Sequence, residues 1–488
     1  MLNCRPLRIL FLLQRPEAWV NIVSLWQFMK DSDDFHPIVW VLPYNFENEK
    51  LSSEKKPLMR KILEDGSISF DEWHGDFSLS DGDFDAVIFN HPYDRERPQA
   101  LWFDCVNAVV PVTIYIPYGP VMAGGHKNMR LQFAQPTQIR ATAVVARSEY
   151  ERAMYGKHCP SGNSHVHVLG QPRFDHLLDS LEKPLPDSLK KEIAGRRTVL
   201  WNSHFSFTHN YSGSSNFSTF DILGPEIFTL AVTMRERLCL LWRPHPGLFP
   251  TIVRSGLLQP DDLPKLRQEL TMIGIILDET PDHVAAFKAS DAMLTDVGSF
   301  LLEFLVTGKP ILALINPDGE PLNEEASQLV AHYACANTPL EIKNFLHQVV
   351  ASTMNFVDFS HAQAEHLPML DGHAGERVAQ LILQLHRNEP LSEWYDVNPD
   401  MNLSAGIKKS TPDLQGSFSE LTGELSPPSF PPVLGHLIRG LIDLRREKSR
   451  ESAFKKKARR RINMVRTNFV EFIKLRPRLM SWARRLRG

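Results

Sequence analysis

Residues 290–314, SDAMLTDVGSFLLEFLVTGKPILAL, decide the fold of this chain. The apolar run Ala292–Leu294 predicts a short buried strand, and Ile311–Ile315 predicts the next one. Between them, apolar residues recur at helical spacing from Ser299 to Gly308, where the glycine ends the helix. This order of strand, turn, helix and strand is typical of a parallel sheet in an α/β protein.

The polar turn Thr295–Ser299 follows the first of these strands, at the edge where open α/β sheets bind ligands. Backbone N–H groups at Gly298 and at the start of the helix suit a phosphate group. Glu303 lies one turn into the helix and is placed to accept a ribose hydroxyl. The alternative is an ordinary βαβ unit in which Asp296 or Ser299 only caps the helix.

Apolar runs that resemble buried strands occur in two series along the chain. The first series contains Arg8–Leu13, Pro37–Leu42, Asp85–Phe89, Val109–Ile116, Thr142–Ala146 and His165–Leu169. The second contains Thr198–Trp201, Cys239–Trp242, Ile273–Leu277 and the unit quoted above. Helical patterns alternate with these runs, so we predict an α/β fold with two Rossmann-like domains facing across a cleft.

The expected domains follow from this alternation and from composition. Residues 1–185 form an N-terminal Rossmann-like domain, and residues 195–392 form a second one. Within the latter, Asn202–Thr219 is rich in Ser, Thr, Asn and aromatic residues and predicts a long loop of the kind that often carries function. Prolines and polar residues predict a linker over 393–433. Residues 434–488 predict a basic amphipathic helical tail.

Charge is distributed unevenly along the chain. The net charge is −3, but from Arg439 to Gly488 eighteen Lys and Arg stand against four Asp and Glu. The tail therefore carries +14 and the remainder −17, which indicates an anionic partner for the tail. Trp and Phe on its apolar face favour an anionic membrane surface over a protein partner or RNA.

The sequence also indicates a compartment. Five cysteines, widely spaced, form neither a zinc pattern nor a disulfide framework, which favours a reducing environment. The apolar run Ile9–Leu13 is too short for a signal peptide, and no run is long enough to span a bilayer. We therefore expect a cytoplasmic protein that lies peripherally on the inner face of the cell membrane and binds no nucleic acid.

Three further turns follow predicted strands and carry candidate functional residues. One is Tyr118-Gly119-Pro120, with His126 close behind, and another is Gly170–Asp175, which contains Arg173. The third is Arg243-Pro244-His245-Pro246. Arginine suits a diphosphate because its fork binds two oxygens, and a histidine beside it is able to donate to the same group or protonate a leaving phosphate. A lone histidine after a strand is more often structural, but the two flanking prolines and the adjacent Arg243 give a functional role equal weight here.

Taken together, these motifs resemble the CDP-glycerol glycerophosphotransferases, the teichoic acid polymerase-like proteins with a GT-B fold. RPHP at Arg243–Pro246 and the quoted stretch are similar to the family's Lys-Pro-His-Pro, Thr-Asp and Lys-Pro elements in its C-terminal domain. Upstream, ATAVVARSEYERAMY and HVLGQPRFDHLL are similar to the family's Ser-Glu and Gly-x-Pro-Arg-x-Asp segments. The resemblance covers ordered patches between Val109 and Leu314.

Two departures from the family pattern bear on chemistry. Where the family has a His-Gly-Thr turn, this chain has Tyr118-Gly119-Pro120, and tyrosine is a poor base at neutral pH. His126 or His91 is a possible substitute. The first serine of the family's pair is Gly298, which still offers a backbone N–H to a phosphate, and the second is Ser299.

The resemblance implies a transferase that uses a CDP-alditol or a nucleotide sugar to extend or prime a bacterial cell-surface polymer on a lipid-linked or polymeric acceptor. It implies the following roles: catalysis by His245, Tyr118 and His126; donor binding by Arg243, Thr295, Asp296, Gly298, Ser299 and Glu303; and an acceptor side at Gly119 and Arg173. No metal and no cofactor is expected, because Arg, His and a helix N-terminus suffice to neutralise a leaving diphosphate.

An Asp-x-Asp sequence, Asp81-Gly82-Asp83, precedes a strand instead of following one, so we interpret it as a solvated loop. Two other functions stay open. One is a UDP-sugar 2-epimerase-like enzyme of the same fold. The other is a catalytically degenerate GT-B scaffold that binds a partner or polymer without turnover.

Overall fold

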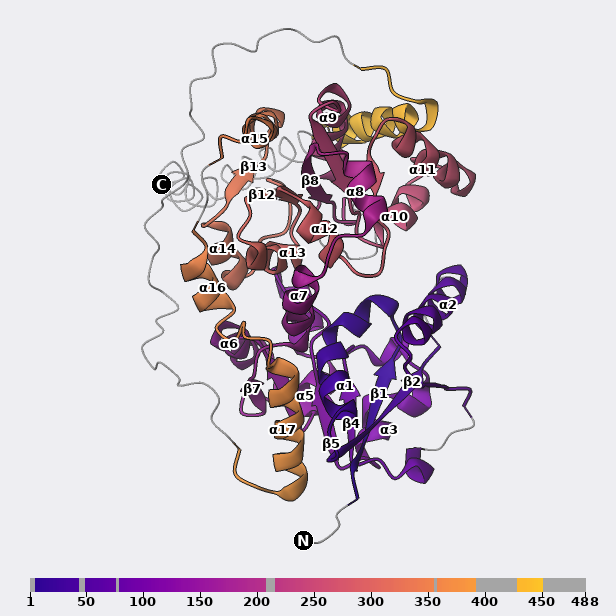
Figure 1. Ribbon diagram of the computed structural model, residues 1–488, viewed down its shortest axis with the longest axis vertical. Helices are drawn as coiled ribbons and strands as arrows, with labels where there is room; N and C mark the ends of the chain where they lie inside the picture. The colour runs from indigo at the N-terminus through magenta and orange to yellow at the C-terminus, as the bar shows by residue number, and fades with distance from the viewer. Residues whose placement is uncertain are drawn as a thin grey trace, which may run out of the picture.

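The computed structural model describes residues 5–43, 49–75, 79–207, 216–354, 358–391 and 428–450. These residues build two parallel sheets, each flanked by helices (Figure 1). The N-terminal sheet lies in the lower half of Figure 1 and the second sheet in the upper half, with the helix α7 (Pro172–Glu182) near their junction. The predicted fold class is confirmed.

The N-terminal sheet has seven parallel strands in the order β3-β2-β1-β4-β5-β6-β7. The strands are β1 (Leu7–Leu13), β2 (Phe35–Val41), β3 (Asp71–Glu72), β4 (Ala86–Phe89), β5 (Val112–Tyr115), β6 (Ala143–Ala146) and β7 (Val166–Val168). The helices of this half are α1 (Val23–Lys30), α2 (Glu49–Asp65), α3 (Phe103–Asn107), α4 (His126–Phe133), α5 (Pro136–Arg140), α6 (Glu149–His158) and α7, whereas α8 (Asp187–Ile193) lies beside the second sheet (Figure 1).

The second sheet has six parallel strands in the order β10-β9-β8-β11-β12-β13. The strands are β8 (Arg197–Asn202), β9 (Leu238–Trp242), β10 (Ile276–Leu277), β11 (Ala292–Thr295), β12 (Ile311–Leu314) and β13 (Ala334–Ala336). The helices that follow β8 are α9 (Phe220–Thr233), α10 (Leu248–Arg254), α11 (Leu263–Met272), α12 (Val284–Ala289), α13 (Phe300–Glu303), α14 (Glu324–Val330), α15 (Pro339–Ala351), α16 (Ser360–His366) and α17 (Ala374–Arg387).

This strand order places a topological switch point between β8 and β11. After β8, the chain adds β9 and β10 on one side of it. The next strand, β11, lies on the other side of β8, and β12 and β13 continue the sheet from there. Helices on either side of such a point diverge, so ligands of doubly wound sheets bind outside the carboxyl ends of those two strands. The quoted stretch supplies β11, and Asn202–Thr219 begins at the end of β8.

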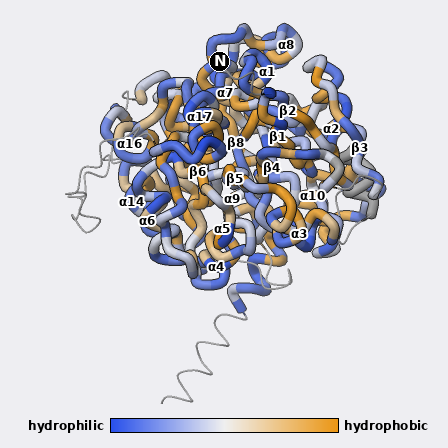
Figure 2. Tube along the Cα trace, turned by 90° about the horizontal axis from the view of Figure 1, so that it is seen from below, coloured by the Kyte–Doolittle hydropathy of each residue, from blue (hydrophilic) through white to orange (hydrophobic). Residues whose placement is uncertain are grey.

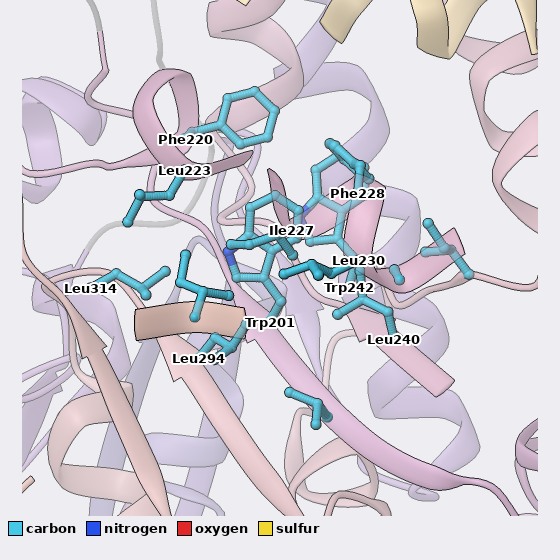
Figure 3. Packing of buried hydrophobic residues seen from close by; sticks show 14 of the residues in the cluster. Trp201, Phe220, Leu223, Ile227, Phe228, Leu230, Leu240, Trp242, Leu294 and Leu314 are labelled. Carbon is cyan, nitrogen blue, oxygen red and sulfur yellow. The ribbon is translucent and has the colours of Figure 1, made fainter. Parts of the chain in front are cut away.

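The strands are continuous apolar runs because both faces of each sheet are covered, and this is why the sequence predicted them. All four residues of β11 and all four of β12 are buried. In β8 and β9, Trp201 and Trp242 stack with ring centroids 5.4 Å apart on one face, within the aromatic core that Figure 3 shows. Leu200 and Leu241 pack on the other face. Hydrophobic segments gather around the strands and hydrophilic ones predominate toward the rim (Figure 2).

α17 returns to the N-terminal domain, although the sequence places it in the second one. Its residues Val378, Ala379, Leu381 and Ile382 belong to the same core as β1 and α1. The carboxylate of Asp175 accepts hydrogen bonds from the backbone N–H groups at the start of α17, at 3.1 Å from Ala374 and 2.8 Å from Gly375. The packing therefore places the C-terminal boundary of the second domain before α17.

The predicted tail is helical over residues 432–450 and packs against the second domain. Leu434, Leu437, Ile438 and Leu441 are buried in the core of α9 and β9, and the yellow helix lies beside α9 and α11 in Figure 1. This apolar face is occupied inside the molecule and is not available to a membrane. Residues 451–488, which carry most of the basic charge, and residues 392–427, which include most of the expected linker, lie outside the described residues.

Across the described ranges, we find no helix that is both long and apolar enough to cross a bilayer.

We predict that the helix at 432–450 is an integral part of the second domain. Replacing the fully buried side chain of Leu437 in L437A removes apolar contacts and leaves a cavity, so unfolding free energy falls by about 2–4 kcal/mol. Urea denaturation followed by circular dichroism measures this change. The matched control is I442A on the same helix, whose side chain is 36% exposed and whose loss costs about 0.5 kcal/mol or less. Equal effects of the two substitutions would contradict the packing.

Candidate functional site

The carboxylate of Asp296 organises the switch point between β8 and β11. Its Oδ2 accepts hydrogen bonds from the backbone N–H of His204 and from Ser218 Oγ, both at 2.7 Å. Its Oδ1 accepts from Thr219 N at 3.0 Å and from Thr219 Oγ1 at 2.6 Å. Asp296 is 1% exposed, and burial raises the pKa of its carboxyl to about 6 despite these bonds. The side chain thus holds both described ends of the loop that follows β8.

Thr295 joins the two central strands at their ends. Its hydroxyl is buried and lies 3.2 Å from Asn202 Oδ1 and 3.0 Å from the carbonyl oxygen of Asp296. Asn202 in turn donates from its side chain to the carbonyl oxygen of Arg243, at the end of β9. The ends of β9, β8 and β11 are therefore fixed to one another by side chains.

The turn after Asp296 opens to free space. A methyl group built on Gly298 meets no atom within 4 Å, so the space beside this glycine is open. The helix that follows is shorter than the sequence predicts, because α13 ends at Glu303 and a 3-10 helix, Phe304–Thr307, continues it. Gly308, with φ of 67°, ends the segment as expected.

Glu303 is fully buried and carries the strongest charge interactions of the site. Its Oε1 accepts from Arg173 Nη1 at 3.0 Å, and its Oε2 lies 2.8 Å from His283 Nε2. Burial by itself raises the pKa of Glu303, but Arg173, His283 and a hydrogen bond from Ser299 outweigh it and lower the pKa to about 2. Glu303 is thus an anion held by a residue of the N-terminal domain and by one of its own domain.

The predicted acceptor turn meets the predicted donor turn at this point. A Cβ built on Gly119 lies 2.9 Å from Arg173 Nη1 and 3.8 Å from Ser299 Cβ. A larger residue at Gly119 would therefore displace the guanidinium. The structure brings together Gly119 and Arg173 from the first domain with Ser299 and Glu303 from the second.

Tyr118 belongs to a polar and aromatic group on the side of the N-terminal domain. Its hydroxyl lies 3.3 Å from Tyr93 Oη, and Gln132 Nε2 donates to it at 3.2 Å. The ring of His91 lies beside it, with centroids 5.6 Å apart, and His91 Nε2 is 3.3 Å from the buried Glu96. His126 is exposed at the first residue of α4.

Arg243 and His245 leave β9 in different directions. Arg243 Nη1 donates to Asp278 at 2.6 Å and its Nη2 donates to the carbonyl oxygen of Thr280 at 2.7 Å, so its guanidinium braces the segment after β10. His245 lies against His204, with ring centroids 5.0 Å apart. The two side chains lie on one turn in the sequence but contact different segments of the chain.

His204 is a residue of the site that sequence reasoning missed. Burial lowers the pKa of its imidazole well below the ordinary value, with a further contribution from His245. Nδ1 accepts from the backbone N–H of Ser206 at 3.3 Å, and Nδ1 of His245 accepts from Gly247 at 3.0 Å. Nδ1 of His204 also lies 2.7 Å from Ser206 Oγ, so the ring is held by the loop after β8. The available signal was a histidine two residues after a central strand.

His283 was missed as well, because it follows no strand directly and precedes a helix of six residues, α12. Its ring packs on Phe287 and Phe300, with centroids 4.7 Å and 4.9 Å away.

The two domains are joined by further contacts beside the site. Ala123 and Leu322 form an antiparallel bridge, and Gly124 N donates to Pro321 O at 2.8 Å. A Cβ on Gly124 would come within 2.6 Å of the Leu322 carbonyl oxygen, so this close approach requires glycine. The loop after β5 is thereby fixed to the loop after β12.

A buried ion pair also crosses the interface. Arg147, at the end of β6, contacts Glu325 at the start of α14, and both side chains are 2% exposed. Glu325 also lies 3.1 Å from His366 Nδ1. Such a buried pair fixes the relative position of the domains more than it adds net stability.

Asp83 of the Asp-x-Asp sequence is exposed and pairs with Arg5 at 3.0 Å. Within the described ranges, no three His, Cys, Asp or Glu side chains are grouped as ligands for a metal ion.

Similar solved structures share this architecture. A UDP-N-acetylglucosamine 2-epimerase has a TM-score of 0.52 at 12% identity, covering 81% of this chain and 100% of that one. The S. aureus MnaA–UDP co-structure has 0.52 at 15% identity, covering 80% and 100%. A variant of the wall teichoic acid polymerase TagF has 0.51 at 10% identity, covering 79% and 90%. The chain has a GT-B fold.

These likenesses establish the fold alone, since all three structures share few residues with the chain. No protein-family model and no curated protein matches the sequence. The two-domain GT-B architecture that the motif resemblance implies is confirmed, while the specific family stays a prediction.

We predict that the charge of Glu303 contributes to stability above about pH 4.5 and that the contribution is lost as pH falls toward its folded pKa of about 2. The gap in unfolding free energy between wild type and E303Q is then largest near pH 6 and narrows by about 1 kcal/mol at pH 3.5. The raised pKa of Asp296 changes the unfolding free energy with pH in the opposite sense. Because Asp296 is present in both proteins, its contribution cancels from the gap.

Urea unfolding at several pH values measures this gap. The control is E279Q, which removes a surface pair with Arg267 whose carboxylate is 41% exposed and whose gap stays small at every pH. A gap for E303Q that does not change between pH 6 and pH 3.5 would show that the ion pair is absent in solution.

Proposed function

We propose that this chain is a transferase that binds a nucleotide-activated donor, a CDP-alditol or a nucleotide sugar, and extends or primes a cell-surface polymer. The observation that supports this best is the meeting of Gly119 and Arg173 with Ser299 and Glu303 where the two domains join. A transfer between two substrates needs groups from both domains at one place. The motif resemblance and the GT-B fold agree with it.

The donor is proposed to lie at the switch point between β8 and β11. Its diphosphate fits the free space beside Gly298, where the turn offers backbone N–H groups. His204 and His245, whose rings lie against each other, are proposed to contribute polar contacts to the same donor. Arg173 brings a guanidinium to the same turn, so the leaving diphosphate is neutralised without a metal.

Glu303 keeps its proposed role toward the ribose, with one addition. Arg173 already contacts Glu303 Oε1. A ribose hydroxyl that binds this oxygen must therefore either share it with Arg173 or displace Arg173 toward the phosphates. The proposed roles of Arg243 and Asp296 become indirect, since Arg243 braces Asp278 and Asp296 holds the loop after β8. Tyr118 and His126 remain candidates on the acceptor side.

The acceptor is proposed to be lipid-linked or polymeric, with the enzyme on the inner face of the membrane. This rests on the sequence of residues 451–488, where Lys and Arg alternate with Trp, Phe and Leu. The helix at 432–450 joins that segment to the second domain.

We expect selective binding of one nucleotide class. Calorimetry and thermal shift with CMP, CDP, UDP, GDP and their sugar or alditol conjugates measure it. Loss of the His245 imidazole in H245A weakens the preferred nucleotide by about tenfold, the effect of one hydrogen bond to a charged group. The control H36A alters an exposed histidine near the start of β2 in the N-terminal sheet and leaves nucleotide affinity unchanged. Binding of none of these nucleotides would overturn the donor site.

A second candidate is an epimerase that acts on a UDP-sugar. It is favoured by the match of the whole length of the 2-epimerase structures, including one bound to UDP. The two functions differ in a direct assay. A transferase consumes the donor and releases nucleotide only when an acceptor is present, whereas an epimerase converts the UDP-sugar to its isomer without one. A protein that binds nucleotide and does neither is the degenerate scaffold.

A further inference from the structure

The helix at 432–450 is fixed to the second domain at both of its ends. At its start, Glu269 of α11 accepts hydrogen bonds from Val433 N at 3.1 Å and from Leu434 N at 2.8 Å. Near its end, Arg445 Nη1 donates to the carbonyl oxygen of Ile222 at 3.1 Å. The helix therefore lies along α9 in a defined register instead of resting on apolar contacts alone.

Lys448 connects this helix to two separate segments of the second domain. Its Nζ donates to Asp221 Oδ2 at 2.6 Å and also contacts the carbonyl oxygen of Phe207. The side chain of Asp221 is fully buried and that of Lys448 is 23% exposed. Burial raises the pKa of Asp221, and Lys448 opposes that effect. A buried carboxylate of this kind is costly without its cation.

One partner of Lys448, Phe207, belongs to the loop that follows β8, and the other, Asp221, is the second residue of α9, directly after that loop. Phe207 ends the first described arm, residues 203–207, and Asp221 lies two residues beyond Thr219, which closes the second arm. Within the loop, Phe217 N donates to Ser206 Oγ at 3.1 Å. Lys448 therefore connects the two ends of the loop on the side of the helix at 432–450, whereas Asp296 connects them on the side of the candidate site.

We infer that Lys448 is a positioning residue for the donor site: it bridges the two arms of the loop after β8 and so sets the place of His204. The helix at 432–450 then serves the site as well as the core. The effect on nucleotide affinity rests on the proposed function, whereas the effect on the loop does not.

Hydrogen exchange of the full chain tests the effect on the loop. In K448M, which removes the charge and keeps the apolar stem, backbone amides of 204–207 and 217–220 exchange about tenfold faster than in wild type. K448R restores slow exchange because it keeps the charge and the donors. The control R446M removes an exposed arginine of the same helix, which pairs with Asp443 on the surface, and changes nothing in the loop.

Unchanged exchange in a folded K448M protein would overturn the inference, as would equal effects of K448M and R446M. If K448M does not fold, K448Q, which keeps a donor and loses the charge, replaces it under the same criteria. Faster exchange that spreads evenly over α9 and β9 would also contradict it, since a general loss of stability is not confined to the loop.

Nucleotide affinity provides the second measurement, with CDP and UDP as probes. K448M weakens the nucleotide that wild type binds by about tenfold, and K448R restores it. If wild type binds neither probe, the proposed function fails while hydrogen exchange still decides the role of Lys448. If wild type binds and K448M binds equally well with an unchanged loop, the role of Lys448 fails and the proposed function stands.

Discussion

The buried carboxylate of Asp296 holds the centre of the second domain together. It stands at the end of β11 and accepts hydrogen bonds from His204, Ser218 and Thr219, which come from two separated parts of the loop after β8. A carboxylate has no donors when ionised, so it suits a position that is surrounded by N–H and O–H groups. Substituting any side chain with a donor there would oppose those groups. The turn at Gly298 therefore follows a carboxylate that holds the two described ends of the loop after β8.

The second constraint is the charge that crosses between the domains. Arg173 reaches Glu303, and Arg147 reaches Glu325, and all four side chains are largely buried. Buried pairs cost much of their attraction in lost hydration, so they define geometry more than they stabilise it. Glycine at Gly119 and Gly124 permits the close approach that these pairs need. The arrangement brings residues of both domains to one turn.

Sequence reasoning predicted the fold well because parallel strands buried on both faces leave continuous apolar runs, as β11 and β12 do. It singled out Ser299 and Glu303 for the same reason, since the turn and helix that carry them come after such a strand. It could not foresee that Asp296 turns inward or that Arg243 pairs with Asp278, because the partner of a side chain depends on segments distant in sequence. It missed His283, which lies before a short helix. It did not foresee that the first part of the predicted tail packs on the second domain, because periodicity shows that a helix face is apolar and not what covers it.

The measurement that tests the account most directly is a structure of the full chain with its preferred nucleotide bound. The account predicts that the diphosphate lies beside Gly298 and Ser299, with the ribose near Glu303 and the loop after β8 still held by Asp296. A nucleotide bound at the N-terminal sheet, or one bound only after Asp296 releases the loop, would contradict it.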